Sequence, residues 1–382
     1  MVLLYSCFVL SIFSNLVPAY GQLEYSMELE SMAISYKVVF FLNACYLIYF
    51  LPFLSHRDHL TIEKYNQIEN NKLLINFSIL YSILAVATII IYFNPVISVV
   101  ASKNWVGNRE LVNSEAVYPY SNIVEKLIIN FVGYFKMIAI LVGLNLIMDP
   151  KNKRLGYIVV LAAGICEMLF AVYAASRGML IFNMIFYFVL FMMYSSKLSL
   201  SKRVISLLGI SIFLVLIIVF FIEITVSRFS SRAFTSFVYY LGQPPFGLAE
   251  EMSDIKTTML GRFAFGTLFG DEKFPVEYST WIHAFYTFSG WLYADWGLWG
   301  SLFMGLIVDL VIMKIINKKT YMISDLFLIL SYFRFLFEGL LTVGRTKSNM
   351  ILITILTFIL LKAVEKNSEF STKKENTIQA IN

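Results

Sequence analysis

The sequence predicts an all-α, polytopic integral membrane protein with about ten transmembrane helices. Its 382 residues are 59% hydrophobic and only 14% charged, whereas a soluble domain carries about 25% charged residues. The apolar residues gather in runs of about 16–23 residues, close to the roughly 20 that cross a hydrocarbon core. The three cysteines all lie inside such runs, so we interpret them as small core residues and not as a disulfide or metal framework.

The first apolar run, residues 2–20, has no Lys or Arg before it, so we interpret it as a transmembrane helix, with a cleaved signal peptide as the alternative. The other predicted spans are 32–54, 73–93, 127–148, 155–175, 179–194, 204–224, 291–313, 321–341 and 348–363. We predict a single transmembrane domain over residues 1–364. The polar, lysine-bearing tail 365–382 is predicted to be disordered in the cytoplasm.

The loop charges predict the orientation of these spans. Alternate loops together hold twelve Lys and Arg, and they are residues 55–72, 149–154, 195–203 and 314–320. The longer segment 225–290 holds five. The positive-inside rule therefore places the basic loops and both termini in the cytoplasm, and residues 225–290 outside. We expect residues 246–280 to form an external cap of short helices.

Charged residues inside the predicted spans are interpreted as structural. Lys136 and Glu167 each lie about 12–14 Å from the outer ends of adjacent antiparallel spans, and we expect them to form an ion pair. Arg334 and Glu338 are four residues apart on one helix, so they can pair locally. Two aspartates near the inner ends of spans are interpreted as interfacial, and these are Asp309 and Asp325.

Three arginines are the candidate catalytic residues of the outer face. Arg177 lies between two apolar runs with almost no loop, while Arg228 and Arg232 are four residues apart, just beyond the span 204–224. A guanidinium group presents a planar fork of donors that fits phosphate oxygens and stays charged. These residues therefore predict a phosphate-bearing ligand, although contact with lipid phosphate is an equal alternative for Arg177.

Further candidates lie in the same outer segment. His283 and Asp295 are candidate bases for a sugar hydroxyl, with a structural role and an arginine partner as the respective alternatives. The candidate substrate-binding residues are Tyr239, Tyr240, Arg262 and Arg345. Aromatic residues at this level are more often part of an interfacial aromatic belt, which is the alternative for the two tyrosines. No DxD pair occurs in the sequence, so we predict no metal and no cofactor.

Three of these segments resemble Wzy-type O-antigen polymerases, the oligosaccharide repeat-unit polymerases. They are Ser176-Arg177-Gly178, the outer loop from Arg228 to Gly242, and Tyr293–Gly300, so the likeness covers mainly residues 170–305. The resemblance implies a GT-C-type glycosyltransferase of the bacterial inner membrane. Such an enzyme transfers the growing glycan from undecaprenyl diphosphate to the incoming lipid-linked repeat unit at the outer face.

The resemblance also implies the partners, which are the undecaprenyl-diphosphate-linked oligosaccharide and the lipid bilayer, with no nucleic acid. Whether a chain-length regulator protein binds is left open. Two alternative functions are an O-antigen ligase and a lipid-linked oligosaccharide flippase or transporter. Transporters usually show repeat symmetry without a large outer cap, and this sequence shows no internal repeat.

Overall fold

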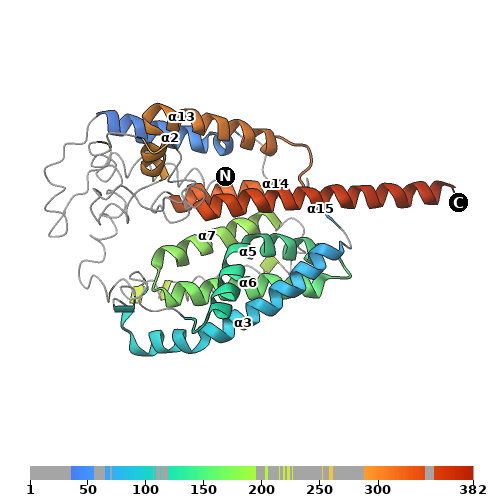
Figure 1. The fold of residues 1–382 in the computed structure, drawn as a ribbon, viewed down its shortest axis with the longest axis horizontal. Coiled ribbons are helices and arrows are strands. Elements are labelled where there is room, and N and C mark those ends of the chain that lie inside the picture. The colour runs from blue at the N-terminus through green and yellow to red at the C-terminus, as the bar shows by residue number, and fades with distance from the viewer. Residues whose placement is uncertain are drawn as a thin grey trace. The chain divides into compact units, whose positions relative to one another are not determined.

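The computed structural model describes residues 36–55, 65–68, 71–105, 107, 108, 112, 119–194, 203, 204, 215, 218, 219, 222, 223, 226, 252, 258–260, 288–339 and 348–381. These residues are helical apart from short connections and one isolated β-bridge. The named helices in Figure 1 are α2 (Tyr36–Ser55), α3 (Lys72–Ser102), α5 (Ile123–Met148), α6 (Lys153–Tyr173), α7 (Arg177–Tyr194), α13 (Phe288–Ile316), α14 (Ile323–Gly339) and α15 (Ser348–Ile381). The predicted all-α class is confirmed.

Five of the described helices are long and apolar enough to cross a membrane, as expected for a membrane protein. They are Lys37–Ser55, Lys72–Ser102, Ile123–Met148, Lys153–Tyr173 and Leu292–Ile316. The predicted span 2–20 and most of 204–224 lie outside the described residues. The total of about ten spans and the GT-C-like arrangement therefore stay predictions.

The exposed surface of α3 shows why lipid suits this chain as a solvent. Large apolar side chains such as Ile83, Ile90 and Phe93 are exposed, while Tyr81 and Ala85 are fully buried on the same helix. A soluble helix would turn polar residues outward at such positions. Contact with lipid accounts for an outer face made of isoleucine, leucine and phenylalanine.

The chain divides into two compact units. Unit 1 comprises Met1–Leu60, Ser231–Lys318 and Leu328–Ile355. Unit 2 comprises Thr61–Ser230, Lys319–Phe327 and Leu356–Asn382. The single transmembrane domain expected over residues 1–364 stays a prediction.

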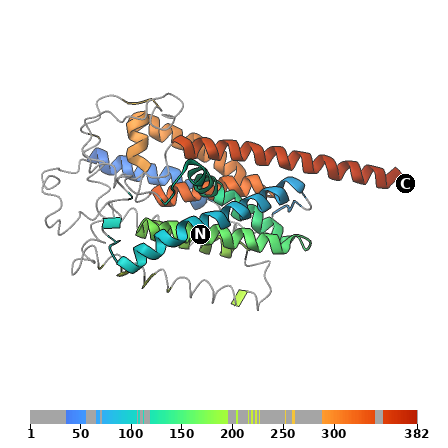
Figure 2. The same cartoon turned by 60° about the horizontal axis from the view of Figure 1, so that its bottom comes forward.

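In unit 2, α3, α5 and α6 pack against one another, and α5 and α6 approach especially closely (Figures 1 and 2). A Cβ atom added at Gly156 of α6 would lie 2.5 Å from the carbonyl oxygen of Gly143 and 2.7 Å from the amide nitrogen of Ile147 on α5. Small residues allow this backbone approach, which is typical of helix packing in membranes. The hydroxyl of Tyr81 on α3 donates to the Val132 carbonyl of α5 at 3.3 Å.

One end of unit 2 joins two segments that the charge pattern assigned to the same side of the membrane. Tyr65 and Tyr321 form the β-bridge, and the amide of Asn66 donates to the Tyr321 carbonyl at 2.8 Å. The hydroxyl of Tyr65 donates to Oδ1 of Asn145 near the end of α5 at 2.6 Å. Burial raises the pKa of Tyr65 well above its ordinary value, so it remains a donor. Which side of a membrane this end faces stays a prediction.

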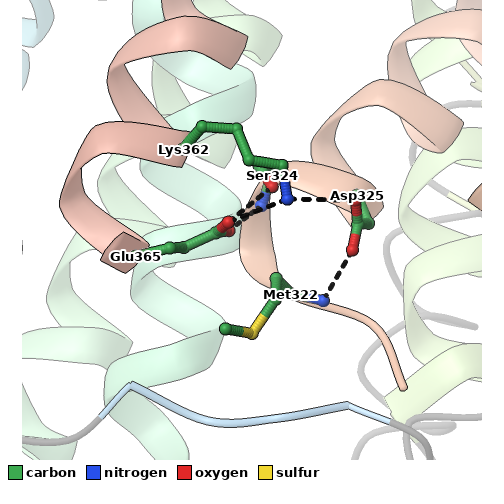
Figure 3. A network of polar contacts seen from close by, with 5 residues as sticks. All are labelled: Met322, Ser324, Asp325, Lys362 and Glu365. Carbon is green, nitrogen blue, oxygen red and sulfur yellow. Dashed lines mark hydrogen bonds and ion pairs between the residues drawn. The ribbon is translucent and has the colours of Figure 1, made fainter. Parts of the chain in front are cut away.

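A polar network at the same end ties α15 to the start of α14 (Figure 3). Glu365 accepts from the Ser324 amide at 2.7 Å and from the Ser324 hydroxyl at 2.9 Å. Asp325 accepts from the Met322 amide at 3.1 Å, and Lys362 Nζ lies 3.3 Å from Asp325 Oδ1 and 3.0 Å from Glu365 Oε2. The amides of a first helical turn need such acceptors because they have no partner within their own helix.

This network bears on two predictions. Asp325 is buried by the protein, and its predicted place at the membrane interface stays a prediction. Glu365 was placed at the start of a disordered tail, yet it is buried and α15 continues as a helix to Ile381. The physical reasons are that the Glu365 carboxylate completes the first turn of α14, and that no proline or glycine interrupts residues 365–381.

In unit 1, α2 and α13 run side by side (Figures 1 and 2). A Cβ atom at Gly305 of α13 would lie 2.6 Å from the ring of Tyr49 on α2. The Tyr49 hydroxyl donates to the Ser301 carbonyl of α13 at 3.2 Å. At one end of α13, Phe288 packs against Gly339 of α14, where an added Cβ atom would lie 3.0 Å away.

Candidate functional site

The α6–α7 hairpin confirms the prediction that Arg177 lies between two helices with almost no loop. α6 ends at Tyr173 and α7 begins at Arg177. The amide of Ser176 donates to the Ala171 carbonyl, and the amide of Ala175 donates to the Val172 carbonyl, both at 3.0 Å. These are the two hydrogen bonds of a Schellman motif. Ala175 takes the left-handed position with φ 44°, where glycine is the usual residue.

A segment that follows α3 completes this turn. The side-chain amide of Asn108 donates to the Tyr173 carbonyl at the end of α6. Trp105, one turn before Asn108, is buried in an apolar cluster that includes Tyr173 and Ala175. The segment therefore covers the hairpin and fixes its backbone.

We expect Asn108→Ala to lower the free energy of unfolding by about 1–3 kcal/mol, because it removes the donor from a carbonyl at a covered helix end. Asn108→Asp should cost more, since it keeps the shape but sets a carboxylate against the carbonyl oxygen. Unfolding by increasing SDS in mixed micelles measures both. A wild-type midpoint for both variants would show that this hydrogen bond does not hold the turn.

The start of α7 is fixed by Ser176. Its hydroxyl oxygen accepts from the Met179 amide at 3.4 Å, and its carbonyl accepts from the Leu180 amide at 3.3 Å. Arg177 is thus the first residue of α7, although the position of its side chain lies outside the description. Helix N-termini favour anions because their free amides and helix dipole are positive.

A break in α13 is the second feature of the candidate site. Gly297 has φ 66° and ψ −174° inside the helix, a conformation that is essentially restricted to glycine. In a continuous helix the carbonyls of Ala294 and Asp295 would accept from the amides four residues later. Here they accept from Met259 at 3.0 Å and from Leu260 at 2.8 Å. The outer segment predicted as a cap therefore contacts α13 where the helix is interrupted.

Asp295 lies two residues before this break and is fully buried. The prediction that Asp295 lies near the start of a span agrees with the candidate span Leu292–Ile316, although α13 itself begins earlier, at Phe288. A backbone interruption at membrane depth is tolerated where protein or a polar cavity surrounds it. The break thus marks a place where polar groups meet inside unit 1.

Two of the predicted site residues lie among the described residues, Arg177 in unit 2 and Asp295 in unit 1. The others lie outside the described residues, and these are Arg228, Arg232, Tyr239, Tyr240, Arg262, His283 and Arg345. Within the described part of the chain, no group of three or more His, Cys, Asp or Glu is placed to hold a metal ion.

Two predicted ion pairs are confirmed. Lys136 Nζ of α5 pairs with Glu167 Oε1 of α6, and both residues are buried. Arg334 Nε and Glu338 Oε1 of α14 lie 2.6 Å apart. Each pair neutralises charge inside a helical unit, which agrees with the structural interpretation.

No protein-family model, curated protein or solved structure matches this chain.

Proposed function

We propose that this chain is a repeat-unit polymerase of O-antigen or capsule synthesis, acting at the outer face of the bacterial inner membrane. The proposal rests on the resemblance of three segments to Wzy-type polymerases. The structural observation that supports it is the α6–α7 hairpin, whose Schellman turn and Ser176 cap fix the backbone of Arg177 at the start of α7. In this proposal both termini lie in the cytoplasm.

The reaction breaks the bond between the reducing-end sugar and the diphosphate, and it forms a glycosidic bond to the acceptor hydroxyl. Arg177, with Arg228 and Arg232, would hold the diphosphate oxygens and stabilise the charge that the leaving group gains. A base, His283 or Asp295, would take the proton of the acceptor hydroxyl. The polyprenyl tails would stay in the bilayer, beside the apolar faces of the helices.

We expect Arg177→Ala to reduce polymerisation by about 10²–10³-fold, because it removes one preorganised donor from the leaving group. Cells with this variant should carry single-repeat glycans in place of long chains, while the amount of inserted protein is unchanged. The matched control is Arg154→Ala, since Arg154 is exposed in the first turn of α6, at the opposite end from the hairpin. Normal chain-length ladders in Arg177→Ala, Arg228→Ala and Arg232→Ala would reject the proposal.

Deleting the protein separates the alternatives. Loss of a polymerase leaves single repeats on the cell surface. Loss of a ligase leaves long polymer on its lipid carrier. Loss of a flippase leaves lipid-linked units that enzymes added from outside do not reach.

A further inference from the structure

Asp309 is an acidic residue inside a membrane span. It lies in the candidate span Leu292–Ile316, seven residues before its end, which is about 10 Å along the helix axis. Its exposed fraction is 1%. The protein itself buries the side chain, with Tyr332 of α14 in contact. The sequence predicts that Asp309 is interfacial, and its depth in a membrane stays a prediction. Acidic residues at such depth are rare and point to function.

The hydroxyl group of Tyr332 connects three helices. Its oxygen lies 2.7 Å from the carbonyl oxygen of Tyr49 on α2 and 3.3 Å from Oδ1 of Asp309 on α13. A tyrosine hydroxyl has one hydrogen, and a carbonyl oxygen can only accept. The shorter contact therefore takes the hydrogen of Tyr332. Tyr332 can share its hydrogen only weakly with Asp309, at 3.3 Å, whereas a protonated Asp309 carboxyl group can donate a hydrogen bond of its own to the tyrosine oxygen.

The second carboxyl oxygen leads to the same conclusion. Oδ2 of Asp309 is buried and has no hydrogen-bond partner in the structure of the described residues. An ionised carboxylate accepts several hydrogen bonds and is strongly disfavoured when it is buried without them. A neutral carboxylic acid that donates one hydrogen bond loses less solvation energy on burial than an ionised carboxylate does.

The surroundings supply no compensating charge among the described residues. From α2 the titratable neighbours are Tyr49, whose hydroxyl donates to Ser301, and Cys45, one turn earlier; from α14 it is Tyr332. All three are neutral at ordinary pH. The arginine of α14, Arg334, is paired with Glu338.

We propose that Asp309 is a proton-binding site within the membrane span, with the proton held between Asp309 Oδ1 and Tyr332 Oη. The bound proton joins α13 to α14, and through the Tyr332 hydroxyl also to α2. Release of the proton leaves a buried anion without a partner, so α13 must move until the carboxylate reaches water. Proton occupancy is thereby coupled to the position of α13. This inference does not depend on the proposed polymerase function.

The test uses the full-length protein in lipid vesicles. A hydrophobic carbodiimide adds to protonated carboxyl groups that lie in apolar surroundings, and peptide mass spectrometry locates the adduct. We expect an adduct on Asp309 at neutral pH that decreases as the pH is raised. Glu167, whose carboxylate pairs with Lys136, is the internal control and should stay unlabelled.

Infrared spectroscopy gives an independent readout. The carbonyl stretching band of a protonated carboxylic acid should be present in the wild-type protein and lost in Asp309→Asn. That variant should stay folded, because its amide group can donate to Tyr332 Oη. The matched control is Asp149→Asn, which should not change the band, because the Asp149 carboxylate accepts from the Lys151 amide at 3.0 Å and from Asn152 Nδ2 at 2.8 Å.

Absence of an Asp309 adduct in the wild-type protein at every pH would overturn the proposal. So would an acid band that survives in a folded Asp309→Asn variant. Since the labelling needs no mutation, the proposal is tested even if the variant does not fold. If Arg177→Ala abolishes polymerisation but Asp309 is never labelled, the proton-binding proposal is rejected and the polymerase proposal stands.

Discussion

Lys136→Met is expected to lower the free energy of unfolding by about 3–5 kcal/mol, because it leaves Glu167 as an uncompensated buried charge. The exposed fractions of Lys136 and Glu167 are 8% and 3%, so neither reaches solvent without movement of α5 or α6. Glu167→Leu should be similarly damaging, since it strands the ammonium group of Lys136. Unfolding in SDS and lipid-like detergent mixtures gives the free energies of both variants.

The double variant Lys136→Met with Glu167→Leu should recover most of this loss, because two apolar side chains replace two desolvated charges. The coupling energy follows from the double-mutant cycle. Lys103→Met is the matched control. Lys103 also pairs with a glutamate, Glu223, but at 3.9 Å with most of the lysine side chain exposed, so its loss should cost less than about 1 kcal/mol. If the double variant is as unstable as the single variants, the ion pair between Lys136 and Glu167 does not contribute to the free energy of unfolding.

Features that depend on spacing along the chain could be predicted from the sequence. Arg334 and Glu338 pair because four residues make slightly more than one helical turn. Lys136 and Glu167 pair because equal depth on adjacent antiparallel helices brings them to one level. The hairpin before Arg177 followed from two apolar runs with no room for a loop.

Features that depend on which helices become neighbours could not be predicted. Tyr49, Asp309 and Tyr332 meet across three helices, and no local pattern marks them as partners. From the local sequence, Glu365 is the first residue of a polar tail. Its role as an acceptor depends on the start of α14, which is distant in the chain. Asn108 likewise finds its carbonyl acceptor on α6, well outside its own loop.

The break at Gly297 shows a different limit. A glycine inside an apolar run costs a helix only about 1 kcal/mol, so the sequence around Asp295 and Trp296 is compatible with a continuous span. The interruption is stabilised by the amides of Met259 and Leu260, which replace the lost helical donors. Its partners come from a segment more than thirty residues away, and only the folded chain shows the match.

α13 therefore combines two departures from a simple membrane helix. Near one end a glycine releases two carbonyls beside the buried Asp295, and towards the other end Asp309 contacts Tyr332. The break at Gly297 and the buried Asp309 both lie on the helix that packs along α2. Asp295 and Asp309 are therefore two buried acidic residues on one helix, separated by the break at Gly297.

Gly156→Ala is expected to lower the free energy of unfolding by about 1–3 kcal/mol, although alanine is the better helix former by about 1 kcal/mol. The new methyl group would lie 2.5 Å from the Gly143 carbonyl oxygen and 2.7 Å from the Ile147 amide nitrogen. Both atoms belong to the backbone of α5, so relief requires the two helices to separate. The same SDS titration measures the effect.

Gly133→Ala is the matched control, because Gly133 also lies in a helix but a Cβ atom there meets nothing within 4 Å. This variant should gain up to about 1 kcal/mol from helix propensity alone. The two substitutions add the same methyl group to glycines of neighbouring helices, and they should shift the SDS midpoint in opposite directions. A stabilised Gly156→Ala protein would mean that α5 and α6 do not meet at Gly143 and Gly156, and the register that pairs Lys136 with Glu167 would need revision.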